Sequence, residues 1–232
     1  MSKKIFNTYF FIARLFPTVI ISVPLLILLW RVDKISNLHE IFTYLSKIEI
    51  IANVTFTIIL WYALTLIVRF PARKIEDEIF IKLDGFPSTY LMLYSNGTYT
   101  KQYKDKFRKS IENKFKYKLL NKKSEIKNIN RAKKSLDEAM GLVREATRGD
   151  EMLLKYNSWY GFYRNLTGGI LYTIMFCFCN LFIFGSILQI NSIYYFHLSI
   201  LILCTVYLLF GKRFLIMSGE DYAKQLHRIF MQ

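Results

Sequence analysis

The amino-acid sequence predicts an all-α integral membrane protein in which four transmembrane helices, two plus two, flank a cytoplasmic helical insert. Three observations predict this class. The chain of 232 residues is 53% hydrophobic and 17% aromatic, yet its net charge is +15. Its charged residues avoid four long apolar blocks and gather between them. Blocks of about 18 apolar residues are long enough to cross the hydrocarbon core of a bilayer, which is about 30 Å thick.

We expect a membrane-spanning helix in each of the four blocks, which are Leu15–Trp30, Ile50–Val68, Leu166–Ile190 and Tyr194–Gly211. The first block contains two prolines, which are tolerated in a span but bend it. A cleaved signal peptide is the alternative for this block, but no small-x-small cleavage site follows it. The predicted domains are an N-terminal transmembrane pair (1–68), a basic cytoplasmic helical domain (69–165), a C-terminal transmembrane pair (166–211) and a cytoplasmic amphipathic tail helix (212–232).

The basic residues between the blocks predict how the chain is oriented. Arg69–Asn165 contains 22 basic and 12 acidic residues, whereas Arg31–Glu49 contains three of each. Short cytoplasmic segments of membrane proteins are rich in Lys and Arg. We therefore expect both termini and the insert on the cytoplasmic side, and the two short loops on the other side.

The insert and the tail carry helical patterns. An apolar residue recurs every fourth position in residues 104–120, at Phe107, Ile111, Phe115 and Leu119. A second amphipathic helix is indicated by Ala132, Leu136, Ala139, Met140, Val143 and Thr147. Both spacings place the apolar side chains on one helical face. In the tail, Ser218 with Asp221 resembles a capping box, which marks a helix start.

The sequence shows no arrangement of residues typical of a catalytic or metal site. The three histidines, His39, His197 and His227, have no partner ligand three or four positions away. The cysteines fall within predicted spans, at a spacing that suits neither a disulfide nor a zinc site: Cys177, Cys179 and Cys204. We therefore expect no enzymatic activity, no metal and no cofactor.

The most basic stretch runs from Lys101 to Lys123, with Arg131 just beyond, and contains only two acidic residues, Asp105 and Glu112. Three explanations compete. The lysines could simply keep the insert in the cytoplasm, or they could attract anionic lipid, which contributes about 1 kcal/mol per basic residue near the surface. They could also bind a polyanion such as an oligonucleotide, whose bases stack on tyrosine. The stretch begins more than thirty residues after the second block, which argues modestly against the first explanation.

Polar residues inside the blocks allow two interpretations. Asn53 and Thr57 lie one turn apart in the second block, and Asn180 interrupts the third. They could form hydrogen bonds between helices, with close packing at Gly168 and Gly169. They could instead line a weakly polar water path in an oligomer.

Two groups of residues resemble sequence motifs of a known family. GFPST (85–89) is similar to G-x-P-T-T, and Thr147-Arg148 followed by NSWYGFYRN (157–165) is similar to T-R … N-x-x-Y-G-F-x-R-N. In these motifs the chain resembles the membrane effectors of the Hailong phage-defence system. The motifs cover about residues 70–170, and the remainder resembles the family in topology only. Ser88 departs from the family's threonine, a mild change because both side chains carry a hydroxyl group.

The resemblance implies a membrane-disrupting or pore-forming effector of the bacterial inner membrane that acts in abortive infection. It implies a homo-oligomer, for which we expect a tetramer. A nucleotidyltransferase encoded nearby would supply a single-stranded DNA oligomer that binds the insert and holds the assembly closed. The alternative function is that of a structural or transport-associated membrane protein whose basic insert docks on anionic lipids.

The residues that we expect to contact such a DNA ligand are Lys101, Tyr103, Lys104, Lys106, Arg108, Lys109, Lys114, Lys116, Lys118, Arg144, Arg148 and Arg164. An aromatic belt at the membrane surface is predicted just before the third block, at Trp159, Tyr160, Phe162 and Tyr163. Arg164 follows this belt, where the insert rejoins the membrane, and we expect it to couple ligand binding to the spans.

Overall fold

The computed structural model describes residues 8–32 and 50–232, apart from the side chains of residues 29–30, 32 and 50–58. Within these ranges the chain forms helices and turns, and no strand, as the sequence predicts. The helices are η1 (Phe11–Leu15, π-helical), α2 (Phe16–Val32), α4 (Ile50–Ile81), α5 (Pro87–Tyr90), α6 (Lys101–Phe115), α7 (Lys122–Lys127), α8 (Ile129–Ala146), α9 (Glu151–Phe182), η2 (Ile183–Ile187, π-helical) and α10 (Asn191–Phe230).

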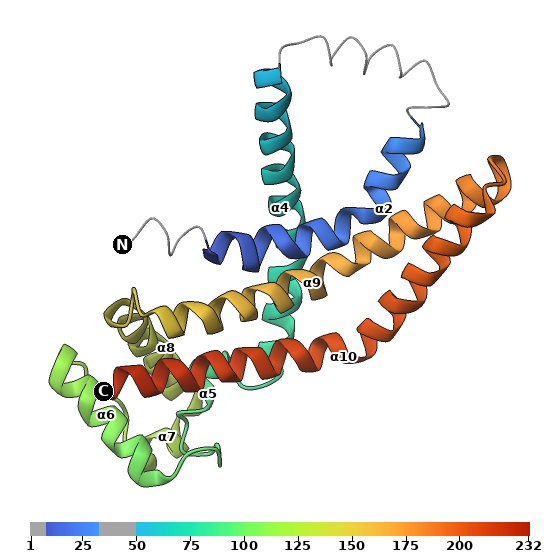
Figure 1. Cartoon of the computed structure of the whole chain (residues 1–232). Helices are drawn as coiled ribbons and strands as arrows, with labels where there is room; N and C mark the ends of the chain where they lie inside the picture. The colour runs from blue at the N-terminus through green and yellow to red at the C-terminus, as the bar shows by residue number, and fades with distance from the viewer. Residues whose placement is uncertain (1–7, 33–49) are drawn as a thin grey trace. The chain divides into compact units, whose positions relative to one another are not determined.

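The chain divides into two compact units. The basic unit comprises Glu76–Tyr160 and Arg213–Gln232, with residues 8–9, and the apolar unit comprises Phe10–Ile75 and Gly161–Lys212. Three helices contribute to both units without a break, namely α4, α9 and α10 (Figure 1).

Within the part of the chain that the structure describes, three helices are long and apolar enough to cross a membrane. They are Thr8–Leu28, Glu151–Ile187 and Asn191–Phe230, with mean hydropathies of 2.2, 2.1 and 2.0. They overlap the first, third and fourth predicted spans. The second predicted span lies in α4, where the side chains of residues 50–58 fall outside the described part of the chain. Several helices are thus suited to a membrane, and the second predicted span, Ile50–Val68, stays a prediction.

Two glycines of α9 lie at close helix contacts in the apolar unit. A Cβ atom on Gly168 would lie 2.2 Å from Cα of Ala72 in α4, and one on Gly169 would lie 2.2 Å from Cδ1 of Ile21 in α2. No side chain fits at Gly168, because it would meet the backbone of α4, whereas at Gly169 the end of the Ile21 side chain would have to move. Membrane helices commonly pack closely through small residues in this way. Figure 1 shows α2 running alongside α9 in this unit.

Polar side chains of α9 add hydrogen bonds to the contact with α2. Oγ1 of Thr173 donates to the carbonyl oxygen of Ile21 at 3.1 Å, and the side-chain amide of Asn180 donates to the carbonyl oxygen of Pro24 at 2.8 Å. Pro24 has no N–H and removes one hydrogen bond from the ladder of α2. Ile21 and Pro24 are three positions apart, so their carbonyl groups lie in one turn of α2 and both accept from α9.

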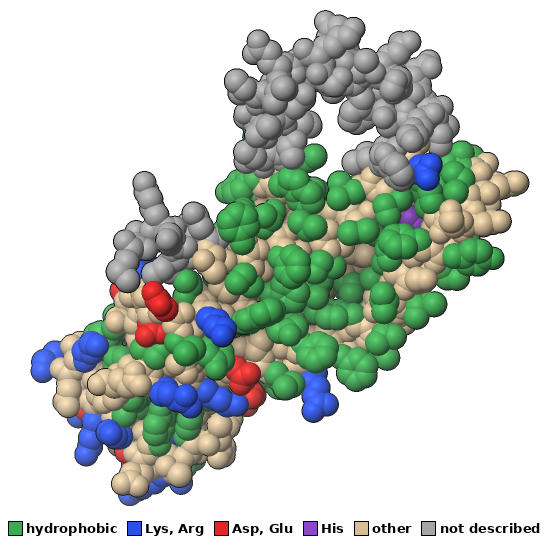
Figure 2. Space-filling view, viewed as in Figure 1, with side chains coloured by type: hydrophobic (Ala, Val, Ile, Leu, Met, Phe, Trp, Pro, Cys, Tyr) green, Lys and Arg blue, Asp and Glu red, His purple; other side chains and the backbone are tan. Residues whose placement is uncertain are grey.

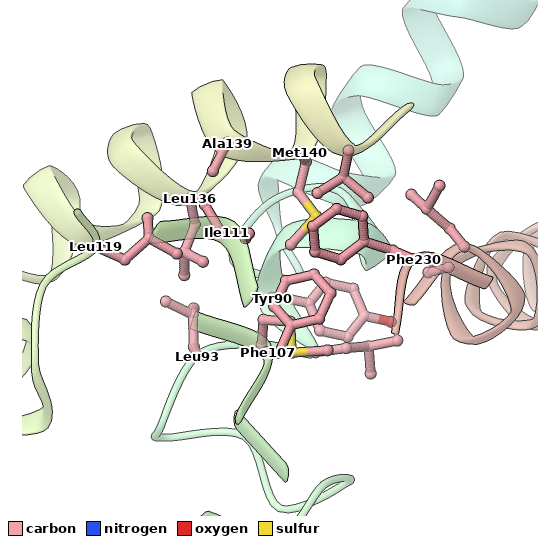
Figure 3. Packing of buried hydrophobic residues seen from close by; sticks show 14 of the residues in the cluster. Tyr90, Leu93, Phe107, Ile111, Leu119, Leu136, Ala139, Met140 and Phe230 are labelled. Carbon is pink, nitrogen blue, oxygen red and sulfur yellow. The ribbon is translucent and has the colours of Figure 1, made fainter. Parts of the chain in front are cut away.

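The core of the basic unit is formed by α6, α8, the end of α10 and the segment around α5 (Figure 3). Its largest fully buried apolar side chains include Phe107, Ile111, Leu136, Met140 and Leu226. The predicted apolar face of α8 is confirmed, because its six residues are all buried. Burying apolar area of this kind contributes about 25 cal/mol per Å², which makes the core the main source of stability for the unit.

Two local predictions are wrong. Helix α6 ends at Phe115 because Lys116 adopts a left-handed conformation, with φ of 56°. Leu119 therefore reaches the core from the segment after the helix, not from the same helical face. Ser218 does not cap a helix either, because α10 continues through it and its hydroxyl group donates to the carbonyl oxygen of Leu215.

Candidate anion-binding surface and pocket

Helix α6 carries much of the predicted ligand-binding set, and its two faces differ. Phe107 and Ile111 are fully buried, and Lys104 and Arg108 lie on the same side of the helix, 1% and 8% exposed. Residues three and four positions apart share a helical face, which explains this grouping. Two of the cations that the sequence assigns to a ligand thus point into the protein.

Lys104 stabilises the loop that precedes α6. Its Nζ donates to the carbonyl oxygen of Leu93 at 2.5 Å and to that of Asn96. Burial lowers the pKa of the Lys104 ammonium group, and the nearby positive charge of Arg108 lowers it further. An ammonium group bonded to two loop carbonyl groups fixes the conformation of that loop.

Arg108 forms a buried ion pair in the basic unit. Its Nη2 lies 2.8 Å from Oε2 of Glu125, its Nη1 donates to the carbonyl oxygen of Met92 at 2.9 Å, and its guanidinium covers the ring of Tyr94 at 4.1 Å. Burial also raises the pKa of Tyr94 to about 12. In this structure neither Lys104 nor Arg108 reaches a solvent-borne phosphate, so their predicted role as nucleic-acid ligands is corrected to a structural one.

The other basic residues of this stretch face solvent. Exposed lysines lie on the outer face of α6 and along the segment that follows it, and we call them the lysine surface: Lys101, Lys106, Lys109, Lys114, Lys116, Lys118, Lys122, Lys123 and Lys127. Glu112 is exposed among them, and the carboxylate of Asp105 accepts a hydrogen bond from the Tyr94 hydroxyl group. Figure 2 shows Lys and Arg side chains gathered over the helical part at the lower left. The lysine surface therefore has a local excess of positive charge.

Tyr103 is only partly available to a ligand. It is half-buried and stacks on Tyr99, with ring centroids 4.6 Å apart and an angle of 22° between the rings. Burial raises the pKa of both hydroxyl groups. One face of the Tyr103 ring is thus occupied inside the protein, and its predicted stacking on a base is limited to the other face.

Ser88 connects the GFPST motif (85–89) to α8 and α10. Its hydroxyl oxygen accepts from Nη1 of Arg144 at 3.4 Å, and its carbonyl oxygen accepts from Nε2 of His227 at 2.9 Å. Nδ1 of His227 lies 3.3 Å from the hydroxyl group of Tyr99. Burial lowers the pKa of His227 to about 4, although its hydrogen bond to Ser88 opposes the shift. A neutral histidine therefore holds the end of α10 against α5.

Arg144 and Arg148, which the sequence assigns to phosphate binding, lie together at a pocket of about 400 Å³. The pocket lies between the end of α8, the turn after it, the first turns of α9 and one residue of α10. Its lining comprises Gly141, Arg144, Glu145, Thr147, Arg148, Gly149, Asp150, Leu153, Leu154, Asn157 and Tyr222. Gly141, Asn157 and Tyr222 are lining residues that the sequence did not indicate as site residues.

Gly141 is the signal in the sequence that could have indicated this pocket. A glycine inside a helix lowers the stability of that helix by about 1 kcal/mol relative to an alanine at the same position. A Cβ atom on Gly141 would meet no other atom within 4 Å, so packing within the described chain does not require a glycine. The missing side chain leaves space that belongs to the pocket.

The aromatic motif NSWYGFYRN (157–165) is divided between the two units. In the basic unit, the hydroxyl group of Tyr160 donates to the carboxylate of Glu76, and its ring stacks on Tyr222 at 6.1 Å. In the apolar unit, the amide of Asn165 donates to the carbonyl oxygen of Ala13 at 2.5 Å. This motif therefore supplies packing contacts to each unit.

This division changes the prediction of an aromatic belt. Tyr160 and Phe162 are buried, with 9% and 8% of each residue exposed, whereas Trp159 is 44% exposed. The belt interpretation is wrong for the two buried rings and stays a prediction for Trp159 and Tyr163. Arg164 is half-buried at the start of the part of α9 that belongs to the apolar unit.

The residues assigned to a pore or to helix packing differ in what the structure shows. Gly168 and Gly169 lie at close helix contacts, and Asn180 is fully buried among α2, α9 and α10 of the same chain. The side chains of Asn53 and Thr57 lie outside the described residues.

Comparisons with known proteins leave the site to be judged on its own geometry. No protein-family model, no curated protein and no solved structure matches the chain.

Proposed function

We propose that the protein is a membrane effector whose basic unit binds a polyanion, in its most specific form a single-stranded DNA oligomer, and thereby controls the membrane helices. The observation that carries this proposal is the lysine surface, which lies in a unit whose helices α4, α9 and α10 continue into the apolar unit. Clustered lysines attract phosphate chains because binding releases counterions from the nucleic acid.

The mechanism is a shift between closed and open states of a homo-oligomer in the bacterial inner membrane. A ligand shifts such an equilibrium only by the difference between its affinities for the two states. The bound oligonucleotide favours the closed state, and its loss during phage infection opens the membrane. A nucleotidyltransferase encoded nearby supplies the ligand. The resemblance supports this direction of control, and the lysine surface supports the chemistry of the ligand.

Binding of fluorescent single-stranded DNA to the purified full-length protein tests the first step. We expect Lys106→Glu with Lys109→Glu to weaken binding by about tenfold or more at low salt. The slope of log affinity against log salt should fall by about 0.7 for each phosphate that the variant no longer neutralises. Lys155→Glu is the matched control, because Lys155 is an exposed lysine of the same unit on another helix. Binding that does not depend on salt, or an equally weakened control, would contradict the proposal.

Leakage from liposomes tests the second step. Protein reconstituted without DNA should release an entrapped dye, and added DNA should suppress the release. Anionic liposomes distinguish the alternative function of lipid docking. If anionic lipid displaces DNA from the lysine surface and no dye is released under any condition, the lipid-docking function replaces the effector function.

A further inference from the structure

We propose that the pocket between α8 and α9 binds a phosphomonoester, a terminal phosphate group attached to a flat apolar body. This site is separate from the lysine surface, because none of the nine lysines lines the pocket. The pocket volume of about 400 Å³ lies in the range that small-molecule sites occupy in proteins.

Two arginines give the pocket its preference for an oxyanion. Arg144 is exposed, and the bond to its neutral partner, the hydroxyl group of Ser88, is long at 3.4 Å. Arg148 pairs with Glu145 across 3.2 Å, and their side chains are 77% and 66% exposed. Exposed ion pairs of this kind are weak, so a ligand can compete for the guanidinium. Guanidinium groups bind phosphate through two parallel hydrogen bonds, and two of them suit a dianion.

The acidic residues of the lining do not exclude an anion. Oδ1 of Asp150 accepts from the backbone N–H of Leu153 at 2.8 Å, so this carboxylate caps the start of α9. Glu145 is the partner of Arg148 and is largely exposed to solvent. Both carboxylates already have donors within the chain, and the phosphate would compete with only one of them, Glu145.

The remaining walls suit a flat apolar group. The lining includes the apolar or aromatic side chains of Leu153, Leu154 and Tyr222, and the amide of Asn157 offers a hydrogen-bond donor and acceptor. Tyr160 stacks on Tyr222, with an angle of 8° between the rings, and so supports that wall. Ligand pockets commonly combine apolar walls with a few placed polar groups.

Gly141 leaves one part of the pocket lining without a side chain. No neighbouring atom of the described chain explains why this position of α8 lacks a side chain. Because Gly141 is one of the lining residues, we expect a leucine at this position to occupy part of the pocket, and its Cβ atom would displace no other atom.

Phosphorus NMR of phenyl phosphate, added to the full-length protein in detergent, tests the proposal. We expect saturable broadening of the phosphate signal. Benzoate should displace phenyl phosphate with an affinity about tenfold weaker than that of phenyl phosphate itself, and phenol should not displace it. Arg144→Gln and Gly141→Leu should each weaken binding by about tenfold or more. Arg131→Gln and Ala146→Leu are matched controls, because both residues are exposed on α8 outside the pocket lining.

The outcomes separate the proposal from its alternatives. Thermal unfolding of each variant, with a midpoint close to that of the wild type, shows that weakened binding does not come from a failure to fold. No saturable signal, or equal binding by Gly141→Leu and the wild type, would overturn the proposal. Equal competition by benzoate or phenol would show that the pocket does not select a phosphate.

Two sources can supply the phosphate group, a free small molecule or the phosphorylated end of a nucleic-acid chain. A short DNA with a 5′-phosphate and the same DNA with a 5′-hydroxyl group distinguish them. Displacement of phenyl phosphate by the phosphorylated DNA alone assigns the pocket to a chain end. Displacement by neither DNA assigns it to a free molecule. Equal displacement by both would mean that internal phosphates suffice, which contradicts selection of a terminal phosphate.

Discussion

The side-chain amide of Asn180 in α9 donates a hydrogen bond to Nε2 of His197 in α10 across 2.7 Å. The roles are determined by the other partners. Nδ1 of His197 lies 2.8 Å from the carbonyl oxygen of Ile193 and must carry the proton, so Nε2 is the acceptor. The same amide nitrogen donates to the carbonyl oxygen of Pro24, and one asparagine thus joins three helices.

We predict that the two histidines in the described part of the chain, both buried, have opposite tautomers. His197 carries its proton on Nδ1, whereas His227 carries it on Nε2 because Nε2 donates to the carbonyl oxygen of Ser88. Nitrogen NMR of protein labelled at histidine, near neutral pH, separates the two forms. His197→Gln and His227→Gln assign the signals. Two signals of the same tautomer would contradict the hydrogen-bond pattern.

The stability of the basic unit should fall in mild acid because of His227. Burial lowers its pKa from 6.5 to about 4 in the folded state. Unfolding therefore takes up one proton between these pH values, and stability is full above pH 6.5 and decreases progressively as pH falls toward about 4. The shift corresponds to about 3 kcal/mol.

Denaturant unfolding of the full-length protein at several pH values measures this effect. Carboxylates also titrate in the same range, so the relevant quantity is the difference between the wild type and His227→Gln. The variant should lack the part of the pH dependence that belongs to one proton. Parallel curves for the two proteins would show that His227 does not contribute.

The buried pair of Arg108 and Glu125 should be strongly coupled. Glu125→Gln or Arg108→Met alone leaves a buried charge without its partner, and we expect each to lower the free energy of unfolding by about 3–5 kcal/mol. The double variant should be destabilised by much less than the sum. Denaturant unfolding of the four proteins measures the coupling, and additive effects would argue against the pair.

Two glycine-to-alanine changes should have opposite effects. Gly168→Ala would push a methyl group into the backbone of Ala72, and overpacking of this kind lowers stability by about 1–3 kcal/mol. Gly141→Ala meets open space and should raise stability by about 1 kcal/mol through helix propensity. Thermal unfolding in detergent compares them. A stabilising Gly168→Ala would mean that α9 and α4 do not touch as described.

The helical elements could be predicted because apolar residues recur with the period of a helix. That period places Leu136, Met140 and Val143 on one face of α8, and all three are buried. The end of α6 could not be predicted in this way. Lys116 carries no sequence signal for its left-handed conformation, which glycine adopts far more often.

The candidate site was harder to predict because the charge composition does not show whether a basic side chain points into the protein or toward solvent. Lys104 and Lys106 look equivalent in sequence, yet the first is 1% exposed and the second faces solvent. Their difference follows from the position of each residue relative to Phe107 on the helix. The pocket depends on Tyr222, which is far from Arg144 in sequence, and a single sequence contains no measure of such proximity.

The burial of Lys104 makes this side chain an internal reporter of opening. Reagents that acylate amines react with accessible, unprotonated lysine, and the Nζ of Lys104 is bonded to two carbonyl groups inside the basic unit. Lys106 and Lys109 on the same helix are exposed and supply the reference rate. The ratio of labelling between these positions therefore follows how often the loop before α6 detaches from the helix, under any ligand or lipid condition, in the protein without substitutions.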